Sequence, residues 1–102
     1  MKLITEKQAA ILGQLINGDE KYGLEMIRDS NGILKRGTIY VLLNRLEDKG
    51  LVKSKSKRQK AGEQGPARRV YQITGTGRKA FYEKVESIQA SLGFQSVGVT
   101  RA

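Results

Sequence analysis

The hydrophobic period of this chain changes at Gly50, and this change sets the order of the elements around it. Before Gly50, apolar residues recur at i, i+3, i+4 and i+7, the spacing of one buried helix face. These residues are Ile39, Leu42, Leu43 and Leu46. After Gly50, residues 51–57 alternate with a period of two, which is typical of a strand. The sequence therefore predicts a helix over residues 36–49, a stop at Gly50, and a strand over 51–57.

Two further helices are expected before this one. Thr5 and Gln8 have the spacing of a capping box, so a first helix starts there and stops at an Asn-Gly pair, residues 17–18. A second, short helix is predicted over 22–30 and stops at the Asn-Gly pair 31–32 in the same way. Its apolar members are Leu24, Met26 and Ile27.

The second half of the chain predicts a hairpin and a last helix. Residues 68–73 are the expected partner strand, with Tyr71 and Ile73 facing the same way, and residues 58–67 are the expected mobile tip. Thr74 can cap a final helix that runs to about Leu92 and stops at Gly93. This helix carries a seam with 4, 3, 4 spacing, formed by Phe81, Val85, Ile88 and Leu92. Residues 94–102 show no periodicity and are expected to fray.

Positive charge is concentrated in the hairpin region. Residues 53–79 hold nine basic side chains and one acid, a net charge of +8 out of +9 for the whole chain of 102 residues. Such a local field suits a polyanionic partner, because each cation placed on a phosphate releases counterions. A merely solvated basic face is the alternative.

Composition narrows the chemistry. The chain has no cysteine and no histidine, which removes disulfides, thiol catalysis and the commonest acid–base group and metal ligand. We find no nucleophile–base pair, and expect no enzyme activity, no metal and no cofactor. Without an apolar run of about 20 residues, we expect no membrane span and a cytoplasmic location.

Three helices followed by a basic hairpin is the order of a winged helix-turn-helix. We therefore predict a mainly α fold with a small β-hairpin (α+β): three helices, a β-wing and a C-terminal dimerisation helix. Residues 1–75 are the expected DNA-binding domain, 76–93 the dimerisation helix and 94–102 a flexible tail. In this fold the third helix enters the major groove, and the wing lies on the backbone or in the minor groove.

Three motifs, in order, resemble the PadR-like transcriptional regulators. They are Tyr-Gly-Leu-Glu-Met-Ile at 22–27, Gly-Thr-Ile-Tyr at 37–40 with Leu43, Leu46 and Gly50 following, and Gly-Pro-x-Arg-x-x-Tyr-x-Ile-Thr-x-x-Gly at 65–77. The resemblance covers about residues 11–82. Val41 stands where the family often has proline, and many members carry a longer C-terminal domain. The resemblance implies a dimeric DNA-binding repressor, with the last helix supplying much of the dimer contact.

The candidate DNA contacts lie at the start and outer face of the third helix and on the wing. They are Lys35, Arg36, Gly37, Thr38, Tyr40, Asn44, Lys53, Lys55, Arg68, Arg69 and Tyr22. Cations and backbone N–H groups at a helix start suit phosphate or guanine, and arginine suits a narrow minor groove. Lys57 completes the lysine face, although the three lysines do not easily reach one backbone. Tyr40 could instead pack on the second helix, and a structural role for Tyr22 is equally compatible with the sequence.

The expected partners are double-stranded operator or promoter DNA and a second copy of the chain. The candidate dimer contacts are Phe81, Val85, Ile88 and Leu92. Phe81 and Tyr82 could line a cavity for a small-molecule effector, but plain interface packing is the favoured interpretation. The alternatives to a promoter-specific regulator are an RNA-binding or a protein-interaction winged-helix module. Sequence readers of RNA usually stack exposed aromatics on bases, and Tyr40 alone is a clear candidate for that here.

Overall fold

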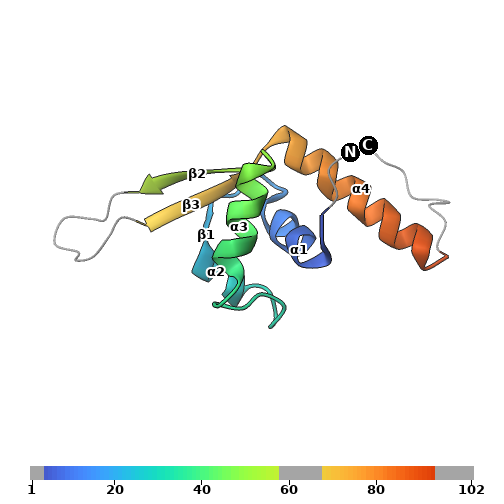
Figure 1. Ribbon diagram of the computed structural model, residues 1–102, viewed down its shortest axis with the longest axis horizontal. Helices are drawn as coiled ribbons and strands as arrows, with labels where there is room; N and C mark the ends of the chain where they lie inside the picture. The colour runs from blue at the N-terminus through green and yellow to red at the C-terminus, as the bar shows by residue number, and fades with distance from the viewer. Residues whose placement is uncertain (1–3, 58–67, 94–102) are drawn as a thin grey trace.

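A computed structural model describes residues 4–57 and 68–93 of the chain. The elements are α1 (Glu6–Leu15), β1 (Lys21–Tyr22), α2 (Gly23–Arg28), α3 (Ile39–Asp48), β2 (Val52–Lys57), β3 (Arg68–Ile73) and α4 (Gly75–Ser91). The strands form one antiparallel sheet in the order β1-β3-β2. The β2–β3 hairpin projects from one side of the helices and α4 from the other (Figure 1). The α+β winged-helix prediction is thus confirmed.

The core lies between α1, α2, α3 and the base of the sheet. The largest fully buried side chains are Ile11, Leu12, Leu15, Met26, Leu34, Ile39, Leu43, Leu46 and Leu51. Leu34 anchors the segment that joins α2 to α3. Its amide donates to the hydroxyl of Ser30 at 3.0 Å, and that hydroxyl in turn donates to the Ile27 carbonyl at 2.8 Å. The buried serine therefore fixes the path of the chain into α3.

Several predicted ends of elements are confirmed. The Thr5 hydroxyl accepts from the Gln8 amide at 3.1 Å, and the Gln8 side chain accepts from the Thr5 amide at 3.0 Å. Gly50, with a φ of +75°, turns the chain from α3 into β2, a left-handed conformation that glycine adopts without strain. The strand β3 has the predicted bounds, and Tyr71 and Ile73 are both buried.

Three predictions about the elements need correction. The third helix starts at Ile39 rather than residue 36, because residues 36–38 form a turn in which the Thr38 and Ile39 amides both donate to the Lys35 carbonyl. The second helix spans only Gly23–Arg28 rather than 22–30. The predicted two-stranded hairpin has a third strand, β1, in which Lys21 and Tyr22 pair with β3.

The start of α4 is fixed to the segment that joins α3 to β2. The Thr74 amide donates to the Leu51 carbonyl at 3.0 Å, and its hydroxyl donates to the Gly50 carbonyl at 2.7 Å. The same hydroxyl accepts from the Gly77 amide at 3.0 Å, as a helix N-cap does. From this anchor α4 runs along α1, and its far end extends past the body of the domain (Figure 1).

Two predictions fall outside the described residues: the wing tip at 58–67 and the tail at 94–102. None of the helices in the two described ranges is long and apolar enough to cross a membrane.

Candidate nucleic-acid interface

The start of α3 presents four consecutive exposed residues. Lys35, Arg36, Gly37 and Thr38 are all exposed, and they form the turn that leads into the helix. The Thr38 hydroxyl is 3.5 Å from the Lys35 carbonyl and does not cap the helix. A methyl group on Gly37 would meet no atom of the described chain within 4 Å, so this end of the helix is open to a partner. Both cations are exposed, but they precede the helix, which begins at Ile39, and their contact with DNA stays a prediction.

The outer face of α3 is exposed as the periodicity predicts. The exposed fractions are 45% for Tyr40 and 50% for Val41, and Asn44 and Arg45 are exposed as well. Within the described part of the chain, the Asn44 amide forms no hydrogen bond, so its donors and acceptor are available to a partner. One turn of helix separates Tyr40 from Asn44, which places both on one face.

Tyr40 both packs on α2 and reaches the surface. A methyl group on Gly23 would lie 2.9 Å from Tyr40 Cε1 and 3.0 Å from its Cζ and hydroxyl oxygen, so the ring rests directly on the glycine. The ring thus packs on α2, as one of the two roles considered from the sequence requires, and its exposure leaves contact with DNA, the other role, as a prediction. Gly23 sets the position of the ring. The spacing of the motif alone does not predict this contact between Gly23 and Tyr40.

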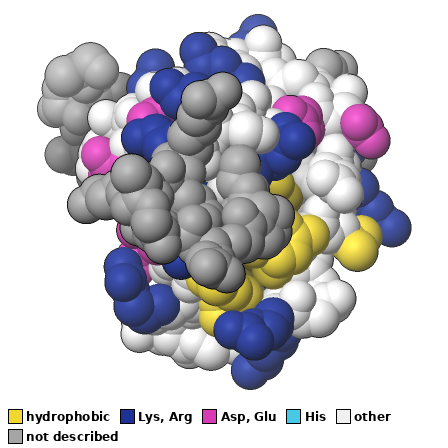
Figure 2. Space-filling view, turned by 90° about the vertical axis from the view of Figure 1, so that its left-hand side faces the viewer, with side chains coloured by type: hydrophobic (Ala, Val, Ile, Leu, Met, Phe, Trp, Pro, Cys, Tyr) yellow, Lys and Arg dark blue, Asp and Glu magenta, His cyan; other side chains and the backbone are white. Residues whose placement is uncertain are grey.

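A hollow of about 400 Å³ lies where α2, α3 and β3 meet. Its lining residues are Tyr22, Gly23, Leu24, Glu25, Tyr40, Arg68, Arg69 and Tyr71. Four of the predicted contact residues, Tyr22, Tyr40, Arg68 and Arg69, therefore come together from three elements. The side of the molecule from which the wing projects shows hydrophobic side chains gathered beside Lys and Arg side chains (Figure 2).

The two wing arginines lie on opposite faces of the sheet. Arg68 pairs in register with Lys57, and its guanidinium lies 5.6 Å from the centre of the Tyr22 ring, a cation–π distance. Arg69 pairs in register with Ser56, on the face that meets α3, and donates to the Ser54 hydroxyl at 2.9 Å. Neighbouring residues of a strand point to opposite faces, so the two side chains leave the strand in different directions although both residues border the hollow.

Ser54 links this arginine to α3. Its hydroxyl donates to the carboxylate of Glu47 at 2.5 Å while accepting from Arg69. These two hydrogen bonds join Arg69, Ser54 and Glu47, and they fix the wing to the last turn of α3. Sequence reasoning missed Ser54 and Glu47 because the contact joins two elements whose relative placement no local pattern determines.

The wing lysines lie on the other face, as the alternation predicts. Lys53, Lys55 and Lys57 share the face of the sheet that carries Val70 and Gln72. Two of them are paired: Lys55 lies 2.8 Å and Lys57 3.5 Å from carboxylate oxygens of Glu20. A second hollow, of about 220 Å³, includes Lys53, Lys55 and Glu20 in its lining, so these lysines are separated from the hollow beside α3.

Leu24 is another residue whose role the sequence did not reveal. The sequence predicts Leu24, Met26 and Ile27 as the apolar members of this helix, and of these three only Met26 is fully buried. Leu24 is 50% exposed and lines the hollow beside Tyr40. The signal was present, because residues two apart on a helix do not share a face.

The seam of α4 is only partly covered by its own domain. Phe81 packs on α1, where a methyl group on Gly13 would lie 3.1 Å from its ring, and it meets Tyr82 edge to face with the ring centres 5.5 Å apart. Val85 and Ile88 are half-buried, and Leu92 is 66% exposed. The predicted interface residues thus form an apolar line that leaves the domain toward the end of α4.

Among the described residues, no cluster of three or more acidic side chains could hold a metal ion.

Residues 11–83 match the profile of the Transcriptional regulator PadR-like family. The chain belongs to this family. The family resemblance found in the three sequence motifs is thereby confirmed.

Solved structures of PadR-family and related regulators share the fold. A transcriptional regulator from Thermoplasma acidophilum is 26% identical, with a TM-score of 0.72 over 85% of this chain and 84% of that one. A PadR-family regulator from Eggerthella lenta is also 26% identical, with a TM-score of 0.68 over 84% and 73%. PadR of Bacillus subtilis, solved with operator DNA, is 24% identical, with a TM-score of 0.65 over 76% and 45%; this likeness shows the fold alone. No curated protein matches this PadR-like chain.

Proposed function

We propose that this PadR-like regulator binds double-stranded DNA sequence-specifically and represses transcription as a homodimer. In this proposal α3 enters the major groove and the wing contacts the backbone or the minor groove. One observation carries the proposal: the exposed face of α3 and the arginines of β3 border the same hollow. The solved complex of Bacillus subtilis PadR with operator DNA, which shares this fold, supports it.

The dimensions and chemistry of α3 suit the major groove. Its 10 residues make a rod about 15 Å long, and the groove is about 12 Å wide. The exposed amide of Asn44 can pair with an adenine edge, and the Tyr40 hydroxyl can reach a base or a phosphate. Lys35 and Arg36, at the start of the helix, can reach phosphate or guanine. These contacts would supply position and sequence preference together.

Arg68, Arg69 and Tyr22 would supply contacts that do not depend on sequence. The guanidinium of Arg68 lies over the Tyr22 ring, and that of Arg69 donates to the Ser54 hydroxyl. Both cations can therefore meet phosphate without first losing much side-chain freedom. The wing lysines Lys53 and Lys55 would add to the same field.

The dimer would form through α4. A helix of 17 residues is marginal alone in water and needs a partner face, and the second half of this one has little of its own domain beside it. We assign Phe81, Val85, Ile88 and Leu92 to that contact. Residues 1–75 would then form the DNA-binding domain and 76–93 the dimerisation helix. We further propose a binding role rather than a catalytic one, and a cytoplasmic location beside the DNA.

A salt series with two nucleic acids tests the proposal. Affinity for duplex DNA and for single-stranded RNA is measured across the series, after selection of bound duplexes from a random pool. We expect tighter binding to the selected duplex at every salt concentration. Asn44→Ala should relax the preference at one base position by about 1 to 3 kcal/mol. A mutant that selects the same site with the same stringency would remove Asn44 from the base-reading set.

A further inference from the structure

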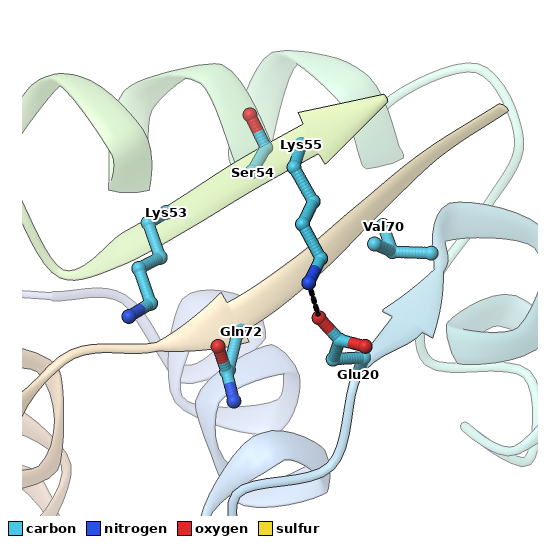
Figure 3. A pocket seen from close by; sticks show the side chains of 6 residues that line it. All are labelled: Glu20, Lys53, Ser54, Lys55, Val70 and Gln72. Atoms are coloured by element: carbon cyan, nitrogen blue, oxygen red, sulfur yellow. Dashed lines mark ion pairs between the residues drawn. The ribbon is translucent and has the colours of Figure 1, made fainter. Parts of the chain in front are cut away.

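The acid nearest to the wing lysines belongs to a different element. Glu20 directly precedes β1, which lies on the side of β3 opposite to β2. The carboxylate therefore reaches across β3 to the lysines of β2. Lys55 and Glu20 point toward each other over that strand, beside Val70 and Gln72 (Figure 3). The two distances, 2.8 Å to Lys55 Nζ and 3.5 Å to Lys57 Nζ, show that one carboxylate serves both cations.

The charge state of Glu20 favours these contacts at neutral pH. The hydrogen bond from Lys55 holds the pKa of the Glu20 carboxyl below its ordinary value, and the positive charges of Lys55 and Lys57 act in the same direction. The carboxylate is therefore ionised at neutral pH. The side chain of Glu20 is 27% exposed, whereas Lys55 is 64% exposed and accessible to an external anion.

A phosphate and the Glu20 carboxylate therefore suit the same ammonium groups. Exposed ion pairs contribute little to stability, so a phosphate can displace the carboxylate at a small cost. Phosphate neutralisation supplies nearly all of the affinity for DNA of arbitrary sequence. Displacing the Glu20 carboxylate from two lysines costs free energy, and this cost would therefore weaken that affinity directly.

We propose that Glu20 acts as an intramolecular competitor of DNA phosphate for Lys55 and Lys57, and thereby weakens binding to duplexes of arbitrary sequence. The identity of the anion rests on the proposed function, whereas the competition itself applies to any extended polyanion. Contacts to phosphate do not depend on sequence, so the same competition would act on an operator and on any other duplex.

Asp19 provides a matched control. It lies next to Glu20, is exposed, and forms no ion pair with a residue that the structure describes. Asp19→Asn and Glu20→Gln each raise the net charge by the same amount at neighbouring positions. Any difference between the two variants therefore reports the contact with the lysines and not the overall charge.

The experiment measures Glu20→Gln and Asp19→Asn against two probes, a duplex of scrambled sequence and immobilised heparin. We expect Glu20→Gln to bind the scrambled duplex about 2- to 10-fold more tightly than Asp19→Asn. Its salt slope should be steeper by up to about 2, near 0.9 for each phosphate gained, and it should elute from heparin at higher salt. In a Lys55→Gln/Lys57→Gln background, the two acid variants should behave alike. Circular dichroism confirms that each variant is folded.

The outcomes separate the two proposals. Equal behaviour of the two acid variants on both probes would overturn the competition, as would a difference that persists without the lysines. If the wild-type protein does not bind duplex DNA, but Glu20→Gln and Asp19→Asn still differ on heparin, the proposed function is overturned and the competition stands.

Discussion

Replacing Gly23 by alanine should weaken DNA binding while leaving the fold almost as stable as before. The added methyl group would lie 2.9 Å from Tyr40 Cε1, whereas non-bonded carbons prefer about 3.5 to 4.0 Å. The ring must therefore move by about 0.5 to 1 Å. Because Tyr40 is 45% exposed, the ring can swing outward without disturbing buried side chains.

The expected magnitudes follow from this geometry. Gly23 lacks a positive φ and is the first residue of α2, so alanine is compatible with its backbone and gains about 0.4 to 1 kcal/mol from the unfolded state. This gain offsets the cost of moving the ring, and we expect the free energy of unfolding to change by less than about 1 kcal/mol. A lost Tyr40 hydrogen bond to DNA should reduce affinity by about 1 to 2 kcal/mol per subunit, or about 5- to 30-fold.

Fluorescence anisotropy with the selected duplex measures the affinity, and thermal unfolding measures the stability. Gly75→Ala is the matched control, because Gly75 is also the first residue of its helix and a methyl group there would meet nothing within 4 Å. In a Tyr40→Ala background, Gly23→Ala should cause no further loss. Wild-type affinity for Gly23→Ala, beside a large loss for Tyr40→Ala, would refute the idea that the glycine positions the ring.

Three further perturbations test the wing, the dimer and the start of α4. Arg68→Ala with Arg69→Ala should weaken binding to all duplexes and flatten the salt slope by about 1 to 2, and an unchanged slope would show that the wing does not neutralise phosphate. Val85→Glu should place like charges across the dimer axis and give a monomer by sedimentation, with an affinity near that of a half-site; a wild-type protein that is monomeric both free and on DNA would contradict this. Gly77→Ala would put a methyl group 2.0 Å from the Leu51 carbonyl oxygen, so we expect a loss of about 1 to 3 kcal/mol and a Tm lower by about 5 to 20 °C. A Tm equal to that of Gly75→Ala would contradict the close packing of α4 on Leu51.

The parts of the fold that the sequence predicted are those decided within a few residues. The capping box at Thr5 and the N-cap at Thr74 join groups three residues apart, and the burial of Leu43 and Leu46 follows from helical spacing. The bounds of β3 follow from its alternation and from the cap at Thr74 that begins the next helix.

The parts that the sequence did not predict depend on contacts distant along the chain. Two residues, Lys21 and Tyr22, form a strand only because β3 offers its edge, and no local period marks them. The ion pair of Glu20 with the wing depends on the position of that strand, so the sequence did not predict the ion pair either. The sequence predicts the candidate DNA contacts from residue type, and only the structure places Arg68 and Arg69 on opposite faces of the sheet and Tyr40 against Gly23.

The spacing of the two half-sites connects the dimer to the DNA. If two α4 helices pair about a two-fold axis, the bound sequence should be a near-palindrome with half-site centres about 34 Å apart. The duplexes selected from a random pool report this spacing directly, and a single undivided site would contradict the symmetric arrangement.

Sequence-specific recognition of duplex DNA is tested most directly by one ratio of affinities. The wild-type protein is titrated with the selected duplex and with a scrambled duplex of the same length and composition, at one fixed salt concentration near the physiological value. We predict that the selected duplex binds at least about 10³-fold more tightly. Equal affinity for the two duplexes would contradict the assignment of α3 as a reader of base sequence.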